Sequence, residues 1–322
     1  MSLPDLMPTR RAVLEMGAAL LLPFPIMSWP RGPTKEPPLR LGLIADLHFG
    51  LEPTAPSRLE AFLEEATQRR ADGVVQLGDF NYGDAESEPC LEMWRSFPGR
   101  RIHVLGNHDM DRVSKTEVMD RWEMAERFQS FDLGGFHFVV LDRNNLRTGD
   151  TLEPYGKANY FVEPKRRAWA DPEQLEWLTA DLKATGLPTV VLVHQGLGVQ
   201  TRGDHHEPAR LEIEKVLREA NRESPKVVAC FCGHHHADRY NLRDGIHYVW
   251  INSASYLWVG EKYGRMATYR DPLFAFADFH RDGKIVLTGR SSDWVSPTPK
   301  DRGYPEELGA PAITSRELRV EQ

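Results

Sequence analysis

The sequence predicts an α/β fold built on a largely parallel, buried sheet. Segments typical of strands alternate with segments typical of helices along most of the 322 residues, which is the pattern of parallel strands joined by helices. The strand segments are near-continuous runs of valine and leucine, as expected for strands that are covered on both faces. The last three strand candidates follow one another without helices, so we also expect an antiparallel portion.

The composition favours a globular protein with a sizeable core. Hydrophobic residues make up 41% of the chain, which is enough for one large domain or two small ones, and no internal repeat marks a second domain. The net charge of −7 disfavours a general nucleic-acid-binding surface, which is typically basic. No run of about 18 apolar residues predicts a membrane-spanning helix. The three cysteines, Cys90, Cys230 and Cys232, argue against a disulfide framework.

The N-terminal 32 residues have the pattern of an export signal. The pair Arg10-Arg11 precedes a weakly apolar run over residues 16–27, which is typical of a twin-arginine signal. No clear cleavage motif follows, and Pro23 and Pro25 interrupt the run, so a leader that is disordered or binds a partner is the alternative. We expect a signal segment and leader over residues 1–32, recognition by the export machinery, a periplasmic or extracellular location, and no membrane span in the mature protein.

In the first half of the domain, apolar runs of strand length alternate with helical patterns. A helix is expected from Pro56, because Leu59, Phe62 and Ala66 lie on one helical face. Two further helices are expected over residues 90–97 and 115–130. The expected strands cover residues 39–45, 73–77 and 102–105.

The second half repeats the alternation. The run Asp171-Pro172-Glu173-Gln174 predicts a helix start, because aspartate caps the helix and proline takes its first position. Another helix is expected over 208–222, with Leu211, Val216 and Leu217 buried, and a polar loop over 142–170. The expected strands are 136–141, 189–193, 227–232, 247–251, 273–279 and 284–287. These elements form a domain over residues 33–290, followed by a polar, proline-rich tail over residues 291–322.

Polar clusters follow five of the expected strands at the point where each strand ends. They are Asp46 and His48, Asp79, Asn107 and His108, His194, and His234 and His236. Ligands of open α/β sheets bind beyond the carboxyl ends of the strands, so we expect these clusters to form one site. A solvated surface turn is the alternative for any single cluster, but five at strand ends favour a shared site.

The residue types in these clusters indicate a metal centre. Histidine nitrogen together with carboxylate and amide oxygen suits iron, zinc or manganese rather than calcium. These side chains are more than one small ion can bind, so we expect two ions. Two ions about 3.5–4 Å apart need a ligand that bridges them, usually a carboxylate. His108 would then remain free beside the ions and able to donate a proton.

Five short motifs contain these clusters. In chain order they are Asp46-Leu47-His48, Gly78-Asp79, Gly106-Asn107-His108-Asp109, Val193-His194 and Gly233-His234-His235-His236. The sequence resembles the calcineurin-like metallophosphoesterases, whose pattern is D-x-H, G-D, G-N-H-[DE], a single histidine after a strand, and G-H-x-H. The resemblance covers residues 46–236. It implies a four-layer α/β/β/α sandwich, with two mixed sheets face to face and helices outside.

The resemblance also implies a role for each site residue. The first ion would be held by Asp46, His48, Asp79 and His236, and the second by Asp79, Asn107, His194 and His234, with Asp79 as the bridge. The ions would be divalent or mixed-valence Fe, Mn or Zn, and a hydroxide between them would attack phosphorus. His108 would protonate the leaving group or contact the phosphoryl oxygen, and Asp109 would orient His108.

We therefore expect a metal-dependent phosphoric ester hydrolase that acts on a small phosphorylated substrate, either a phosphomonoester or a small phosphodiester, without a nucleic-acid partner. A nuclease or a nucleotide pyrophosphatase on the same scaffold is the alternative among enzymes. A metal-binding protein without turnover is an alternative of a different class. The pair His108-Asp109 argues against that class, because a structural site needs no free acid.

Three further residues are candidates for contacts at the site. Arg143 and Asn144 follow a strand and are candidate substrate-binding residues, since a guanidinium matches phosphoryl oxygens; surface ion pairs are the alternative for Arg143. Tyr82 fits the G-D-x-x-Y motif of purple acid phosphatases, in which the tyrosine binds iron. That group has no histidine at the position of His48, so we expect Tyr82 to pack near the site without binding metal.

Overall fold

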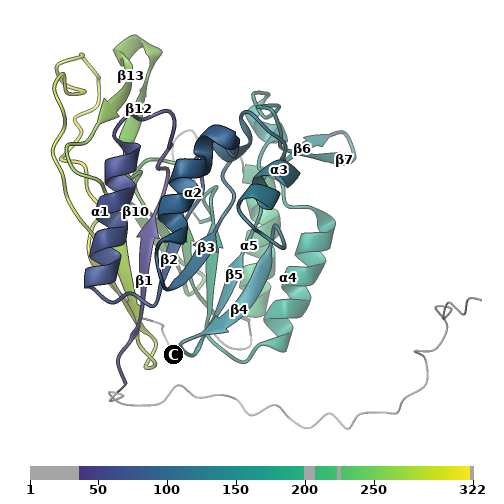
Figure 1. The fold of residues 1–322 in the computed structure, drawn as a ribbon. Helices are drawn as coiled ribbons and strands as arrows, with labels where there is room; N and C mark the ends of the chain where they lie inside the picture. The colour runs from purple at the N-terminus through teal and green to yellow at the C-terminus, as the bar shows by residue number, and fades with distance from the viewer. Residues whose placement is uncertain (1–35, 199–206, 223–225, 320–322) are drawn as a thin grey trace, which may run out of the picture.

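Two six-stranded mixed sheets form the centre of the computed structural model, which describes residues 36–198, 207–222 and 226–319 (Figure 1). The first sheet has the order β16 (Arg316–Arg319), β15 (Lys284–Thr288), β14 (Ala275–Phe279), β1 (Leu39–Ile44), β2 (Gly73–Gln76), β3 (Arg100–His103). The second has the order β10 (Arg239–Arg243), β11 (Ile246–Trp250), β9 (Val227–Cys232), β8 (Thr189–Val193), β5 (Phe136–Val140), β4 (Gln129–Leu133). In the first sheet, neighbouring strands among β1, β2 and β3 are parallel. In the second sheet, neighbouring strands among β5, β8, β9 and β11 are parallel. The other neighbouring strands in both sheets are antiparallel.

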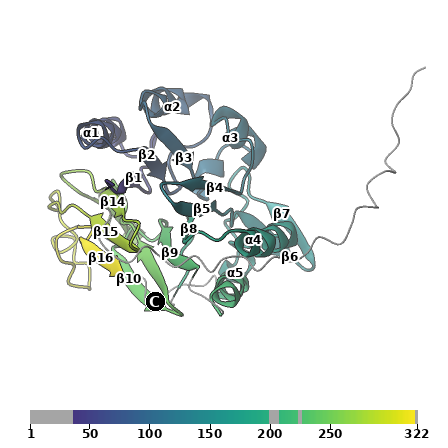
Figure 2. The same cartoon turned by 90° about the horizontal axis from the view of Figure 1, so that it is seen from below.

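Helices cover the outer faces of the two sheets, which gives four layers (Figure 2). The first sheet is covered by α1 (Ala55–Gln68) and α2 (Glu88–Arg95), with α3 (Lys115–Arg121) beside them. The second sheet is covered by α4 (Pro172–Ala184) and α5 (Glu207–Ala220). The predicted α/β class and the four-layer sandwich implied by the family resemblance are confirmed.

Successive side chains of β1 show why the central strands are largely apolar. Leu41 and Leu43 pack into the core between the two sheets. Ile44 faces the opposite way, into the cluster beneath α1 and α2. Gly42 also faces α1, and a Cβ atom there would lie 3.0 Å from the ring of Phe62. A strand buried on both faces has no polar side, which is why its period-2 pattern is absent from the sequence.

Short elements complete the chain between the main strands and helices. Two hairpins are formed by β6 (Asn145–Thr148) with β7 (Thr151–Pro154) and by β12 (Tyr256–Gly260) with β13 (Arg265–Thr268). The four single-turn 3-10 helices of the described residues are η1 (Ala85–Ser87), η2 (His108–Met110), η3 (Pro164–Arg166) and η4 (Glu261–Tyr263). None of the described helices is long and apolar enough to cross a bilayer. The predicted export signal over residues 1–32 lies outside the described residues.

The structure corrects the prediction of one helix over residues 115–130. The helix α3 ends at Arg121, because Trp122 turns inward and Glu123 takes a left-handed conformation (φ 58°). Residues 129–133 instead form the edge strand β4, whose alternating Phe131 and Leu133 pack against the core between the sheets. The alternation of these two side chains is the strand signal that the helical interpretation overlooked.

Three smaller expectations also differ from the structure. The loop predicted over residues 142–170 contains the hairpin of β6 and β7. The tail predicted from residue 291 includes β16, which pairs with β15 at the edge of the first sheet. In α5, Leu217 is buried as predicted and Val216 partly so, but Leu211 is exposed and Ile213 is buried instead. Short, polar edge elements bury little apolar surface, and their patterns are correspondingly weak.

A buried histidine links the second sheet to its covering helix. The Nδ1 atom of His137 in β5 lies 2.6 Å from Asp132 Oδ1, and its Nε2 atom lies 2.8 Å from Asp181 Oδ2 in α4. The hydrogen bond to Asp181 outweighs the burial of the ring and, with that to Asp132, raises the pKa of His137 above its ordinary value. The charged imidazole therefore fastens α4 to the sheet.

Asp181→Asn should destabilise the fold more at about pH 5.5 than at about pH 9. The folded-state pKa of His137 is raised above its unfolded value of about 6.5, so its contribution is fully present below that pH and is lost as the pH rises through the folded-state pKa. We expect a loss of about 1–2 kcal/mol at the lower pH, measured by chemical denaturation in EDTA. The control Glu261→Gln removes an exposed pair with Arg265 and should show no such dependence. Equal losses for Asp181→Asn at both pH values would contradict the charged state of His137.

Candidate metal centre

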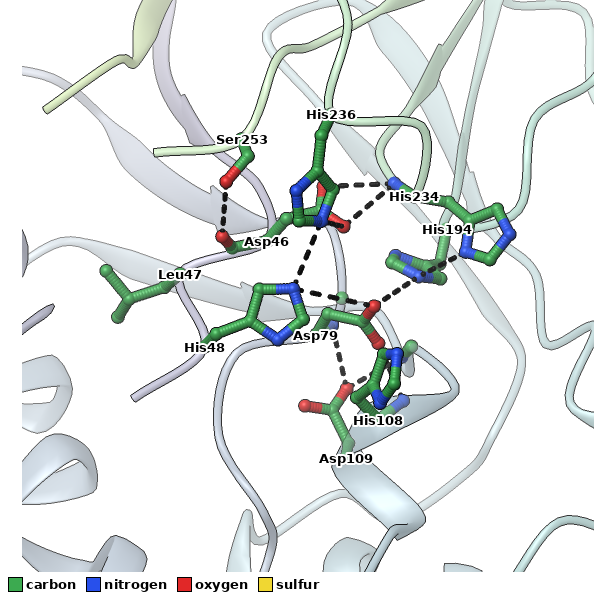
Figure 3. Close-up of polar contacts among 12 residues, drawn as sticks. Asp46, Leu47, His48, Asp79, His108, Asp109, His194, His234, His236 and Ser253 are labelled. Atoms are coloured by element: carbon green, nitrogen blue, oxygen red, sulfur yellow. Dashed lines mark hydrogen bonds and ion pairs between the residues drawn. The ribbon is translucent and has the colours of Figure 1, made fainter. Parts of the chain in front are cut away.

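Five loops bring polar side chains together at the carboxyl ends of strands from both sheets (Figure 3). The first sheet supplies residues after β1, β2 and β3, and the second supplies residues after β8 and β9. The side chains predicted as metal ligands are Asp46, His48, Asp79, Asn107, His194, His234 and His236.

The ligand atoms of six of these residues form two groups. One group is Asp46, His48 and His236, and the other is Asp79, His194 and His234; within each, the candidate ligand atoms lie within 4.8 Å of one another. Each group therefore contains residues from loops of both sheets: at least one carboxylate after a strand of the first sheet, and at least one histidine after a strand of the second. A cation in either group would join the two sheets.

Asp79 lies between the two groups. Its Oδ2 atom is 3.1 Å from Nε2 of His194 and 4.0 Å from Nε2 of His48. The other carboxylate oxygen, Oδ1, accepts a hydrogen bond of 2.8 Å from the backbone N–H of His108. This placement suits the bridging role that the family resemblance implies, because one oxygen is turned toward both groups.

Hydrogen bonds behind the histidines fix which ring nitrogen faces the centre. The Nδ1–H group of His194 donates to the carbonyl of Leu77 at 2.7 Å, and that of His236 donates to the carbonyl of Tyr256 at 2.7 Å. Each ring therefore presents its unprotonated Nε2 atom to the cluster, as metal-binding histidines do. His234 presents Nδ1 instead, 3.2 Å from Nε2 of His194.

Two observations show that this donor set fits bound cations. The buried Oδ1 atom of Asn107 has no hydrogen-bond partner, which is costly unless a cation completes its surroundings. The Nε2 atoms of His48 and His236 face each other at 3.1 Å, where two lone pairs would repel without a proton or a metal between them. Nitrogen and oxygen donors of this kind suit Fe, Mn or Zn.

The backbone at the centre is strained. Five of the candidate ligands adopt the left-handed conformation, with φ values of 51° at Asp46, 52° at His48, 51° at Asp79, 70° at His234 and 46° at His236. A non-glycine residue in this region costs on the order of 1–3 kcal/mol. Such clustering of strained residues is typical of functional sites, where the surrounding structure holds side chains in one required geometry.

Glycine is required immediately before the bridging residue. Gly78 has φ +92°, and a Cβ atom there would lie 2.4 Å from Nδ1 of His194. The backbone between β2 and Asp79 therefore packs directly against the imidazole of a ligand from the other sheet. In the G-D motif, glycine is therefore required because no larger side chain fits at this position, and aspartate for its chemistry.

The comparisons with known proteins agree with this fold. A family model described as calcineurin-like phosphoesterase matches residues 39–238. The chain belongs to the calcineurin-like phosphoesterase family. It is therefore a metal-dependent phosphoester hydrolase, and the family's dinuclear centre corresponds to the two groups of ligand atoms.

A solved structure of a dimetal phosphatase shows the same fold. A dimetal phosphatase from Danio rerio is 16% identical, with a TM-score of 0.64 over 89% of this chain and 100% of that chain. A purple acid phosphatase from yellow lupin (Lupinus luteus) seeds is 13% identical, with a TM-score of 0.49 over 88% of this chain and 55% of that chain. Among curated proteins, none matches the sequence.

In this phosphoesterase, Asp109 does not orient His108 as predicted. Its buried carboxylate accepts hydrogen bonds from the backbone N–H groups of Gly106 (2.7 Å), Asp79 (3.1 Å), Phe80 (2.7 Å) and Asn81 (3.1 Å). Asp109 thus holds the loops after β2 and β3 together.

The side chain of His108 is instead held by Asp111 and Tyr160, each 2.8 Å from its Nδ1 atom. Burial disfavours the charged imidazole, but the carboxylates of Asp79 and Asp111 outweigh it and raise the pKa of His108 to about 9. The spacing His108-x-x-Asp111 was a possible sequence signal for one of these partners. Tyr160, 52 residues from His108, had none.

The predicted substrate contacts through Arg143 and Asn144 are not seen in the phosphoesterase structure. The Arg143 side chain is buried and donates to main-chain carbonyls, including those of Gln195 (2.9 Å) and Gly196 (2.8 Å). Asn144 donates to the carbonyl of Leu105 at 2.8 Å and accepts from Nε2 of Gln195 at 2.6 Å. Arg143 thus fastens the loops around the second sheet to one another. Asn144 joins that sheet to the segment after β3 of the first sheet.

Tyr82 lies beside the site with its ring beneath Arg112, whose guanidinium is 3.9 Å from the ring centroid. Burial and the nearby charge of Asp111 raise the pKa of Tyr82 above its ordinary value, with Arg112 opposing this effect. A neutral phenol stacked under a guanidinium fits the packing role expected for Tyr82.

Asp79→Ala should lose bound metal, because it removes the oxygen that lies between both groups. We expect metal analysis of this phosphoesterase to show about two ions per chain in the wild type and a clear reduction in Asp79→Ala. Saturating metal at about 100 times its dissociation constant should stabilise the wild type by about 2.7 kcal/mol, and Asp79→Ala should lose this stabilisation. His108→Ala is the control and should retain the metal. Equal metal content in the two variants would contradict the bridging assignment.

Proposed function

We propose that the protein hydrolyses phosphomonoesters or small phosphodiesters, with Fe, Mn or Zn as the resident ions and His108 as the proton donor to the leaving group. When bound, such ions lower the pKa of a water molecule and neutralise charge on phosphoryl oxygens. The net charge of −7 does not oppose an anionic substrate, because cations would set the local field.

The observation that carries this proposal is the position of His108 at the edge of the ligand cluster. Its imidazole lies 5.4 Å, ring to ring, from that of His48, and its side chain is 36% exposed. Asp46 and His194, by contrast, are fully buried at 0% exposure. A substrate can therefore reach His108 from solvent, next to His234, which is also partly exposed.

The chemistry of His108 suits protonation of a leaving oxygen. The hydrogen bond to the carboxylate of Asp111 favours the charged form of the imidazole, which is the form that has a proton to give. Its Nδ1 atom is occupied by Asp111, which leaves Nε2 as the atom that donates. As the bond from phosphorus to the leaving oxygen breaks, that oxygen takes the electron pair and the Nε2 proton.

His108→Ala should keep both metal ions and lose about 10²–10⁴-fold in kcat. The assay uses p-nitrophenyl phosphate and bis(p-nitrophenyl) phosphate with Mn, Fe or Zn, and metal analysis on the same samples. A preference between the two esters identifies the monoester or diester class, and nucleotide diphosphates test the pyrophosphatase alternative. Wild-type protein that carries two ions yet hydrolyses none of these substrates would refute the proposal.

We also propose that the protein is exported. The support is the paired Arg10-Arg11 before the apolar run over residues 16–27. In a bacterial host with a twin-arginine system, replacing both residues with lysine should move the protein from the periplasmic to the cytoplasmic fraction. Arg31→Lys, outside the motif, is the matched control and should leave the distribution unchanged. Unchanged export of the double variant would count against this signal.

A further inference from the structure

A triangle of hydrogen-bonding groups surrounds the Nδ1 atom of His108. The Oδ2 atom of Asp111 lies 2.8 Å from Nδ1. The hydroxyl of Tyr160 lies 2.8 Å from the same nitrogen and donates to Oδ1 of Asp111. The carboxylate can therefore accept one hydrogen bond on each oxygen, from the imidazole and from the phenol.

Local backbone geometry explains why His108 and Asp111 meet. His108 starts the 3-10 turn η2, and the N–H of Asp111 donates to the carbonyl of His108 at 3.2 Å. Residues three apart in a 3-10 turn lie on the same face, so the two side chains stand one above the other. The neighbouring Arg112 does not compete for this carboxylate, because its guanidinium pairs with Asp84 and Glu86 at 2.8 Å each.

Tyr160 reaches this turn from a separate segment, which is itself anchored to it. The N–H of Lys157 donates to the carbonyl of Val113 at 3.0 Å, and the N–H of Ala158 donates to the carbonyl of Met110 at 3.1 Å. The Tyr160 ring is 3% exposed and packs against that of Tyr155, with 5.0 Å between the centroids. The position of the phenol is therefore fixed by the protein's own packing and backbone hydrogen bonds, without a substrate.

We propose that Asp111 and Tyr160 are positioning residues that hold His108 with its Nδ1–H toward Asp111 and its Nε2 toward the leaving group. This inference rests on the proposed function and deepens it. The hydrogen bond at one imidazole nitrogen determines which nitrogen is offered on the other side. When the leaving oxygen takes the Nε2 proton, His108 becomes neutral and keeps its own Nδ1–H in the hydrogen bond to Asp111; solvent water returns a proton to Nε2 before the next turnover.

The test uses two esters that differ in their need for a proton. Phenyl phosphate has a poor leaving group, whereas 2,4-dinitrophenyl phosphate has a good one that departs without protonation. Asp111→Asn should lower kcat for phenyl phosphate by about 10–100-fold, within the range of general acid catalysis, and change kcat for the dinitrophenyl ester by less than about threefold. Tyr160→Phe, which removes one oxygen atom, should show the same selectivity with a smaller loss. KM and metal content should change little.

A spectroscopic measurement tests the position of the imidazole without turnover. In the diamagnetic zinc-loaded protein, ¹⁵N NMR should show the Nδ1 atom of His108 protonated, with the resonance assigned by its absence in His108→Gln. Asp111→Asn should shift this population toward the Nε2-protonated form. Asp120→Asn, an exposed carboxylate in α3, is the matched control and should alter neither the spectrum nor the rates.

The outcomes separate this inference from the proposed function. An active wild type in which Asp111→Asn and Tyr160→Phe lose equal activity on both esters, or lose metal, would overturn the positioning role. An unchanged imidazole spectrum in Asp111→Asn would overturn it as well. A wild type that hydrolyses neither ester would instead contradict the proposed function and with it the proton-donor role of His108.

Discussion

The buried carboxylate of Asp109 is the interaction on which the geometry of the centre depends. It accepts four backbone hydrogen bonds, from Gly106, Asp79, Phe80 and Asn81. They lock the loop after β2 to the loop after β3, and so fix Asp79 relative to Asn107 and His108. Without that lock, the two ligand groups and the proton donor would not share one rigid frame.

The close packing of the two sheets extends this frame across the molecule. The ends of β2 and β8 approach so closely that the ring of His194 leaves no room for a Cβ atom at Gly78. The Nδ1–H of that ring donates a hydrogen bond to the carbonyl of Leu77. On the other side, the hydroxyl of Ser253 donates to the carbonyl of Asp46 at 2.8 Å. Such contacts offset the strain of left-handed ligand residues, which a flexible loop would relieve by moving.

The sequence predicted the fold and the gathering of the candidate ligand side chains at the strand ends, because both depend on strong local patterns. The central strands β1, β2, β8 and β9 are buried on both faces and read as continuous apolar runs, and the ligands follow their ends directly. The edge strands β4, β10 and β16 are short and partly polar, so their signals are weak. Asp109 and Asp111 are both carboxylates close to His108, and sequence cannot tell which one faces the imidazole. Arg143 was misjudged because its partners are main-chain carbonyls, which no side-chain pattern records.

The ligand groups that span both sheets have a consequence for how the protein acquires its ions. Asp46 and His236 are 190 residues apart, and so a partly folded chain presents only scattered single donors of low affinity. Binding of an ion by either group would therefore follow the docking of the two sheets, and the ion would then act as a late cross-link between distant parts of the chain.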